Sequence, residues 1–140
     1  ERLLALGLKK ETADCCYYYY DGEYLIAFAE DAKYPSDIPA WSLHRLIEMM
    51  PRTIRANDEL FFLLVSKEDV FYDDTEGTAY SSFTNRNGLY YNITLCIEWL
   101  IKEGYFPKEY LVDLTGTDSH QDMVDAFGYA FEVMKAKKEE

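Results

Sequence analysis

One pair of side chains has the types and spacing of a small metal or acid–base site. His44 and Glu48 lie four residues apart in a helical pattern, so both would project from one face of a helix. A zinc site needs three or four ligands, and no second histidine motif joins this pair. A surface contact between residues four apart explains the pair equally well.

A second group of side chains could bind a hard cation through oxygen. Asp73, Asp74 and Glu76 stand before Gly77. A calcium loop needs ligands at spaced positions and a distal bidentate carboxylate, and this stretch is too short to supply them. A polar turn between two strands uses the same residues with fewer assumptions.

A third group, Asp118, His120 and Asp122, stands where a last helix would begin. Carboxylates are favoured at a helix start by the helix dipole alone. The sequence contains no nucleophile elbow, no phosphate-binding glycine loop and no zinc-binding helix motif. We therefore expect no catalytic residue, no cofactor and no metal. An enzyme whose site assembles from distant residues stays open.

The three cysteines indicate a reducing compartment. Cys15 and Cys16 are adjacent and Cys96 is remote, and an odd count with an adjacent pair does not form a disulfide framework. Free cysteines are typical of cytoplasmic proteins. The start of the chain has neither a Met nor a signal-peptide pattern, which leaves a removed leader open.

The charge balance restricts the class of partner. The chain has 26 Asp and Glu against 14 Lys and Arg, a net charge of −12, while 49% of its residues are hydrophobic. This composition indicates a folded anionic protein, which repels nucleic acid phosphates and anionic membranes and attracts basic partners. No apolar run has the length of a membrane span. We expect no direct nucleic acid binding and no membrane.

The first half of the chain predicts mainly helices. Leucines around Gly7 indicate a short helix with a glycine stop, and a second short helix is expected from Glu11 to about Tyr18. Asp21-Gly22 is a turn signal before a strand at Tyr24 to Phe28. The clearest helix runs from Pro39 to Met50, because four apolar residues share one face and Pro51 follows.

The second half predicts a meander followed by helices. Short apolar runs at 60–65, 70–72 and 79–84, separated by polar turns, read as antiparallel strands. An apolar stripe from Leu89 to Ile101 predicts a central helix that ends near Gly104, and a last helix follows from Thr117 or Ser119.

Grouped strands favour an α+β fold over an α/β fold. We expect one domain, residues 1–140, with a small antiparallel sheet of three to four strands covered on one face by three to five helices. Whether residues 24–28 join that sheet is open.

Aromatic residues are the best candidates for a binding surface. Four consecutive tyrosines cannot all face a core, so part of the run at 17–20 must be exposed, and exposed aromatic clusters mark contact surfaces. Packing of this run between a helix end and a strand is weighed equally. Core packing is the favoured alternative for Trp41 and Tyr90. The candidate interaction residues are Tyr17, Tyr18, Tyr19, Tyr20, Trp41, Tyr90 and Tyr91.

The stretch from Pro39 to Pro51 resembles a Pro-Ala-Trp-Ser-Leu helix found in small proteins of Bacteroides-type bacteria and their mobile elements. In that group the helix also ends at a proline and precedes a short meander and an apolar helix. The resemblance implies a cytoplasmic, prophage- or element-associated protein of unknown activity, and it carries over no catalytic residue.

Three functions fit these observations. The first is a non-enzymatic protein–protein interaction module, with self-association as one form of it. The second is a DNA mimic that inhibits a nucleic-acid-binding protein, although interspersed lysines dilute a continuous acidic face. The third, ranked last, is a small-ligand binder or enzyme with a site between sheet and helices.

Overall fold

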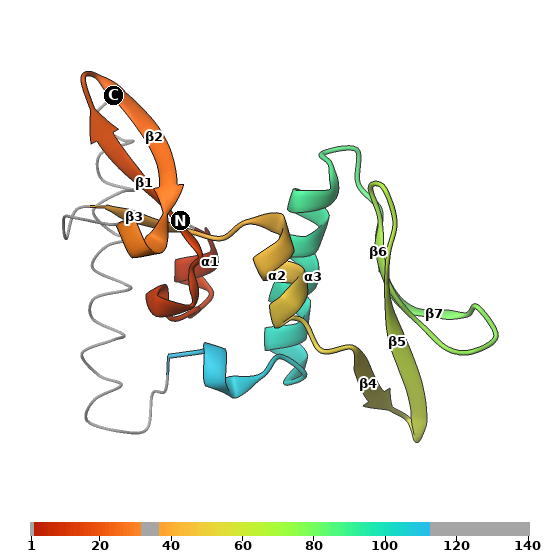
Figure 1. Ribbon diagram of the computed structural model, residues 1–140. Coiled ribbons are helices and arrows are strands. Elements are labelled where there is room, and N and C mark those ends of the chain that lie inside the picture. The colour runs from red at the N-terminus through yellow and green to blue at the C-terminus, as the bar shows by residue number, and fades with distance from the viewer. Residues whose placement is uncertain (1, 32–36, 113–140) are drawn as a thin grey trace. The chain divides into compact units, whose positions relative to one another are not determined.

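The computed structural model describes residues 2–31 and 37–112, so the predicted last helix lies outside the described residues (Figure 1). The chain divides into two compact units. Among the described residues, the first unit contains 2–31, 37–45 and 108–112, and the second contains 46–107. Each unit has its own antiparallel sheet. The α+β class is therefore confirmed, with two sheets where one was expected, and organisation as one domain stays a prediction.

The first unit is built on a three-stranded sheet in the order β2-β1-β3. The strand predicted at 24–28 belongs to this sheet and not to the meander. Its elements are α1 (Arg2–Ala5), η1 (Lys10–Thr12), β1 (Cys15–Tyr20), β2 (Glu23–Phe28), η2 (Ala29–Asp31), β3 (Ile38–Ala40) and η3 (Lys108–Tyr110).

A two-residue turn creates the β1–β2 hairpin. Asp21 and Gly22 both have positive φ, at 50° and 83°. This conformation matches the right-handed twist of paired strands, and Asp-Gly is among its preferred sequences. Six residue pairs follow without a register shift, from Tyr20↔Glu23 to Cys15↔Phe28.

The helix expected from Glu11 to Tyr18 is therefore wrong. Helical structure stops at Thr12, and aromatic residues with a suitable turn favour a strand.

A buried threonine holds the base of the hairpin. Thr12 Oγ1 donates to the carbonyl of Lys9 at 2.6 Å and accepts the indole N–H of Trp41 at 2.9 Å. The backbone carbonyl of Thr12 accepts Nε of Arg45 at 2.9 Å. One residue thus connects η1, the segment after β3 and the following helix.

The segment at 108–112 packs back onto the N-terminal residues of the same unit. The N–H of Lys9 donates to the carbonyl of Tyr110 at 2.9 Å, and the N–H of Val112 donates to the carbonyl of Gly7 at 2.8 Å. Leu8, which is fully buried, forms an isolated antiparallel bridge with Leu111. The first unit therefore combines chain segments that are about a hundred residues apart.

The predicted Pro39–Met50 helix begins later than expected. Helix α2 spans Leu43–Met49, whereas Pro39 and Ala40 belong to β3. Pro39 lies opposite Cys16 of β1. Backbone hydrogen bonds alternate in direction along an antiparallel strand, and the N–H and C=O of Cys16 point toward β2. The pair of Cys16 and Pro39 is therefore not hydrogen-bonded, and the missing N–H of proline removes no bond between β1 and β3. Ser42 Oγ accepts the N–H of Arg45 at 3.1 Å and caps the helix start.

The second unit is an antiparallel meander with strand order β4-β5-β6-β7 and one long helix. The predicted runs at 60–65, 70–72 and 79–84 are strands, and the preceding strand β4 was not predicted. The turn between β4 and β5 consists of Asn57 and Asp58, both at positive φ. The elements are β4 (Thr53–Ala56), β5 (Glu59–Val65), β6 (Val70–Asp73), β7 (Ala79–Phe83) and α3 (Leu89–Glu103).

Helix α3 packs against β6 and β7 and supplies the core of the second unit. Four of its apolar side chains are fully buried: Ile93, Cys96, Ile97 and Leu100. Trp99 lies among four rings, with centroid distances of 5.7 Å to Tyr105, 5.9 Å to Tyr80, 6.1 Å to Phe83 and 6.2 Å to Tyr72. Gly104, in the left-handed conformation, ends α3 as predicted.

The first prediction concerns the carboxylate of Asp14, which ties the start of β1 to the start of α2. Oδ1 accepts the N–H of Ser42 at 2.8 Å, and Oδ2 accepts the Ser42 hydroxyl. Burial alone would raise the pKa of Asp14, but the hydrogen bonds from Ser42 outweigh it and lower the pKa below 3.8. The ionised form is thus favoured in the folded state.

Its stabilisation is present above pH about 4 and is lost as the pH falls through the lower folded pKa. We expect Asp14→Asn to lower the free energy of unfolding at pH 7 by about 1–2 kcal/mol and to flatten its decline in acid. Urea unfolding at pH 7, 4 and 3 measures both effects. Asp58→Asn, in an exposed turn where Asn is tolerated at positive φ, is the control. Equal stability of wild type and Asp14→Asn at every pH would contradict this role.

Candidate functional site

Among the described residues, those predicted to do chemistry are not gathered into a site. His44 and Glu48 are both exposed on α2. Within residues 2–31 and 37–112, no group of three or more His, Cys, Asp or Glu side chains could hold a metal ion. The described part of the chain therefore offers no ligand set that His44 and Glu48 could complete.

The acidic run before Gly77 forms a turn. Asp74 Oδ1 accepts the N–H of Glu76 at 2.9 Å and the N–H of Thr78 at 2.8 Å. These bonds engage a carboxylate oxygen that a cation would need, which supports the turn interpretation. The third group, Asp118, His120 and Asp122, lies outside the described residues.

The cysteines are free thiols with different exposure. Cys16 and Cys96 are buried, and Cys15 is half-buried. Burial raises the pKa of Cys96 to about 12. The pKa of Cys15 is also raised, first by burial and then by the neighbouring Asp14 carboxylate. Both shifts favour the neutral thiol, which is a poor nucleophile and a poor metal ligand.

The predicted interaction residues separate into three places. Trp41 is 3% exposed, so it belongs to the core of the first unit, in agreement with the core packing favoured for it from the sequence. Tyr90 and Tyr91 lie on α3 of the second unit, and Tyr90 is 45% exposed, so core packing does not describe it. Only the run at 17–20 forms part of an extended exposed surface.

Strand alternation places the four consecutive tyrosines on opposite faces of the hairpin. Tyr17 and Tyr19 share one face with Tyr24, Ile26 and Phe28, because residues paired across strands project to the same side. We call these five residues the hairpin aromatic face. All five are exposed, from 42% for Tyr17 to 67% for Phe28, and the rings of Tyr19 and Tyr24 meet edge to face at 5.2 Å.

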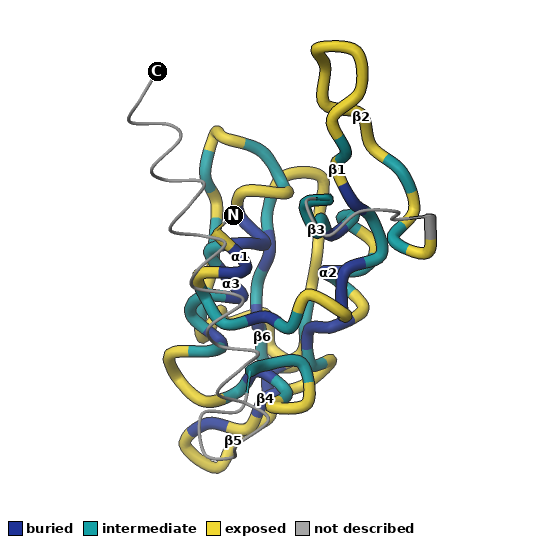
Figure 2. Tube along the Cα trace, turned by 90° about the vertical axis from the view of Figure 1, so that its left-hand side faces the viewer, coloured by how far each residue is buried: buried dark blue, intermediate teal, exposed yellow. Residues whose placement is uncertain are grey.

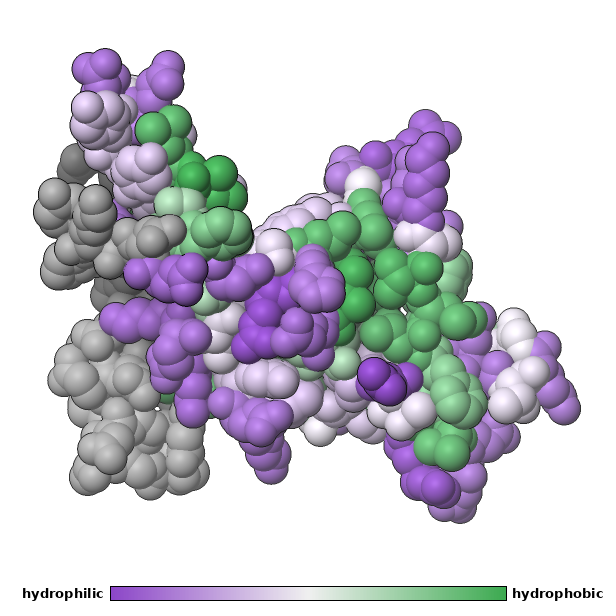
Figure 3. All heavy atoms as spheres, viewed as in Figure 1, coloured by the Kyte–Doolittle hydropathy of each residue, from purple (hydrophilic) through white to green (hydrophobic). Residues whose placement is uncertain are grey.

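Figures 2 and 3 show the hairpin that carries this surface. In Figure 2 the hairpin is coloured as exposed over most of its length and as buried only near its base. In Figure 3 an apolar band covers β2 at the upper left. A sheet surface of this kind normally packs against another layer, and among the described residues the hairpin aromatic face has none.

The opposite face of the hairpin anchors it at the base only. Cys16 is 3% exposed and its partner Ala27 is half-buried, whereas the outermost pair, Tyr20 and Glu23, is exposed. Among the described residues, the hairpin is therefore held at its base, and its outer half extends away from the rest of the first unit (Figure 1).

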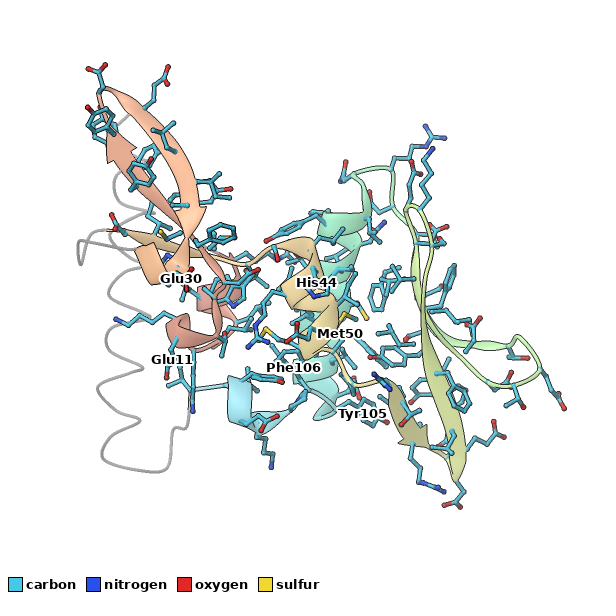
Figure 4. The ribbon with its side chains drawn as sticks, in the orientation of Figure 1. Glu11, Glu30, His44, Met50, Tyr105 and Phe106 are labelled. Atoms are coloured by element: carbon cyan, nitrogen blue, oxygen red, sulfur yellow. The ribbon has the colours of Figure 1, made fainter. Side chains whose placement is uncertain are left out.

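Acidic residues stand at both ends of the hairpin aromatic face. Asp21 and Glu23 lie at the turn, and Glu30 lies in η2 at the base, where Figure 4 labels it beside the strands. η2 contacts β1. From residue 11 to residue 32 the sequence contains no Lys or Arg. The apolar surface thus has a negative charge at each end and no basic residue in its own segment.

A second, smaller apolar surface lies on the meander of the second unit. Leu60, Phe62 and Leu64 project from one side of β5 and are 43%, 39% and 50% exposed, while Phe61 on the other side is buried. Leu64 pairs with Phe71 of β6, which is half-buried. This surface has three large exposed side chains against five on the hairpin aromatic face, and each of the three is less exposed than every member of that face except Tyr17.

Sequence reasoning missed three of the five residues of the hairpin aromatic face: Tyr24, Ile26 and Phe28. The signal was present, because an Asp-Gly turn fixes the pairing of the residues on either side of it. Counting outward from Asp21-Gly22 pairs Tyr19 with Tyr24 and Tyr17 with Ile26, as the structure does. A helix expected over 11–18 concealed that symmetry.

Comparison with protein-family models, with functionally characterised proteins and with solved structures finds no match to this chain. In the described ranges no helix has the length and apolar character needed to cross a membrane. The hairpin aromatic face is therefore identified as the candidate site by the chemistry and geometry of the chain itself.

The second prediction concerns the order in which the thiols react. At pH 8 a thiol with a pKa of about 12 is ionised in about one molecule in ten thousand, and Cys96 is also buried. We expect a maleimide to modify Cys15 first and slowly, while Cys96 reacts only after unfolding. Mass spectrometry of peptides from native and urea-treated protein measures the order. The Cys15→Ser variant should lose the native-state reaction, and modification of Cys96 as fast as Cys15 would contradict the assignment.

Proposed function

We propose that this chain is a non-enzymatic protein-binding module whose first unit holds a protein partner on the hairpin aromatic face. The observation that carries the proposal is five neighbouring apolar side chains, each at least 42% exposed, on a regular two-stranded scaffold. Folded proteins expose single apolar residues freely, but contiguous apolar surfaces mark interaction sites.

The residue types fit an interface. Tyrosine and phenylalanine offer a large contact area with few rotatable bonds, and aromatic residues are enriched among the side chains that dominate binding energy. Three tyrosines, one isoleucine and one phenylalanine form the face. Their spacing on a paired ladder makes the surface pre-organised, which lowers the ordering cost of binding.

The acidic composition fits a protein partner better than nucleic acid mimicry. A mimic of nucleic acid needs a row of carboxylates at phosphate-like spacing, whereas the carboxylates of the hairpin stand at the ends of an apolar surface. A net charge of −12 favours encounter with a basic partner. Cytoplasmic location and an origin in a mobile element stay predictions from cysteine usage and from the resemblance.

The third prediction tests the hairpin aromatic face with matched substitutions. Ile26→Thr replaces a 61% exposed strand residue by a polar β-branched one, and Leu64→Thr makes the comparable change on the second unit at 50% exposure. We expect a partner captured from lysate by the wild-type chain to be retained by Leu64→Thr and reduced at least about tenfold with Ile26→Thr, as for a central interface anchor. Quantitative mass spectrometry of the captured proteins measures the ratio.

Circular dichroism and the melting temperature confirm that both variants are folded, since exposed substitutions change stability little. Equal capture of the same partner by all three proteins would contradict the proposal. A loss confined to Leu64→Thr would move the binding surface to β5 of the second unit.

A further inference from the structure

We infer that the free edge of β2 accepts an extended strand from a partner protein, and that this strand carries alternating apolar residues with Lys or Arg at both ends. The inference rests on the proposed function, because it specifies how a partner engages the hairpin aromatic face. It adds the backbone geometry and the sequence class of the bound segment.

The strand order makes β2 an edge. Among the described residues, β2 pairs only with β1, which pairs with β3 on its other side. The N–H of Ala29 donates to the carbonyl of Asp14 at 3.0 Å, so this pair is of the hydrogen-bonded type. Bonded pairs alternate along an antiparallel ladder, and the next bonded pair contains Ala27.

It follows that the N–H and C=O groups of Tyr24 and Ile26 point away from β1, toward the edge. The N–H of Phe28 points the same way, while its carbonyl also accepts the thiol of Cys16 at 3.7 Å. These groups are the template that an added strand uses.

Over residues 24–28, and within the part of the chain that the structure describes, this edge lacks the features that usually prevent strand addition. β2 is six residues long, contains no Pro and no Lys, and keeps its register with β1 without a bulge. Folded proteins normally protect an edge of this length with charge, proline, a bulge or a covering element. Within β2 only Glu23, the first residue, is charged, and the rest of the strand is an apolar edge without proline or bulge, which indicates a surface that a partner covers.

Pairing fixes which partner side chains meet the hairpin. Residues opposite Tyr24, Ile26 and Phe28 in an added antiparallel strand project to the same side as those three residues. They would extend the hairpin aromatic face and must be apolar. The intervening residues project to the other face, where Leu25 and Glu23 are exposed, and have no such requirement.

Charge selects a basic partner over a second copy of this chain. Asp21 and Glu23 stand at one end of β2 and Glu30 at the other, so a bound strand gains from Lys or Arg at both ends whatever its direction. Antiparallel pairing of β2 with a second β2 would bring Glu23 of one copy toward Glu30 of the other. Each copy also has a net charge of −12, so the overall charge adds a repulsion between two copies.

The test uses synthetic peptides and the full chain. The basic probe is fluorescein-labelled Lys-Arg-Val-Thr-Val-Thr-Val-Lys-Arg, and a matched probe replaces its four basic residues with glutamate. We expect the glutamate probe to bind at least about tenfold more weakly in fluorescence anisotropy. Raising the salt from low to moderate concentration should weaken only the basic probe, since exposed charges are screened.

Backbone methylation separates strand addition from general attraction. N-methylation of the valines removes the N–H groups that would face β2, whereas N-methylation of the threonines alters groups that face away. We expect the first change to weaken binding at least about tenfold and the second to leave it nearly unchanged. Equal effects of the two methylation patterns would overturn strand addition.

A variant of the chain makes the complementary test. Proline at position 26 removes an N–H that faces the edge and breaks no bond to β1, so Ile26→Pro should block the basic probe while the hairpin stays folded. If Ile26→Pro disrupts the hairpin, the methylated probes still decide the question.

The two proposals fail in different ways. Strand addition is overturned, and the proposed function stands, if Ile26→Thr reduces partner capture but the basic probe does not bind the wild-type chain at millimolar concentration. Equal capture of the partner by the wild-type chain and by the Ile26→Thr variant overturns the proposed function itself. A dimer of the wild-type chain at micromolar concentration that Ile26→Pro abolishes would assign the edge to a second copy and overturn the basic partner.

Discussion

The left-handed turn at Asp21 and Gly22 is the constraint on which the candidate site depends. With φ of 50° and 83°, these two residues allow a turn whose twist matches that of the flanking strands. The turn sets Tyr20 opposite Glu23, and every later pair follows from that one. A shift of one residue would exchange the two faces of β2 and move Ile26 and Phe28 to the other side.

Among the described residues, support for the hairpin comes from its base, and no layer covers the hairpin aromatic face. Thr12 binds Lys9, Trp41 and Arg45 through its two oxygens, and Asp14 binds Ser42 at the start of α2. These contacts hold the strand ends while the outer half of the hairpin carries exposed side chains on both faces. A scaffold held in this way presents an apolar surface in a defined geometry without burying it.

Much of the second unit could be predicted from sequence because its signals are local. The stripe from Leu89 and the glycine at 104 define α3, and polar turns separate the runs that become β5, β6 and β7. Strand β4 was missed because its turn uses Asn57 and Asp58 at positive φ without a glycine. Non-glycine residues in that conformation are uncommon and give a weak signal.

The first unit was harder to predict because it depends on contacts between distant segments. The helix expected from Glu11 to Tyr18 was wrong because residues from Cys15 onward form β1, whose pairing with β2 and β3 overrides the local pattern. Pro39 looked like a helix start, yet it lies in an edge strand where its missing N–H is harmless. Exposure of part of the tyrosine run at 17–20 was predictable, but the contribution of Ile26 and Phe28 required the strand register.

The placement of the two tryptophans has a spectroscopic consequence. The chain has only Trp41 and Trp99, and one belongs to each compact unit. Trp41 is buried with its indole N–H bonded to Thr12, whereas Trp99 lies among three tyrosine rings that can transfer excitation energy to it. Each unit therefore contains its own intrinsic fluorophore, and loss of structure in one unit can be distinguished by emission from loss of structure in the other.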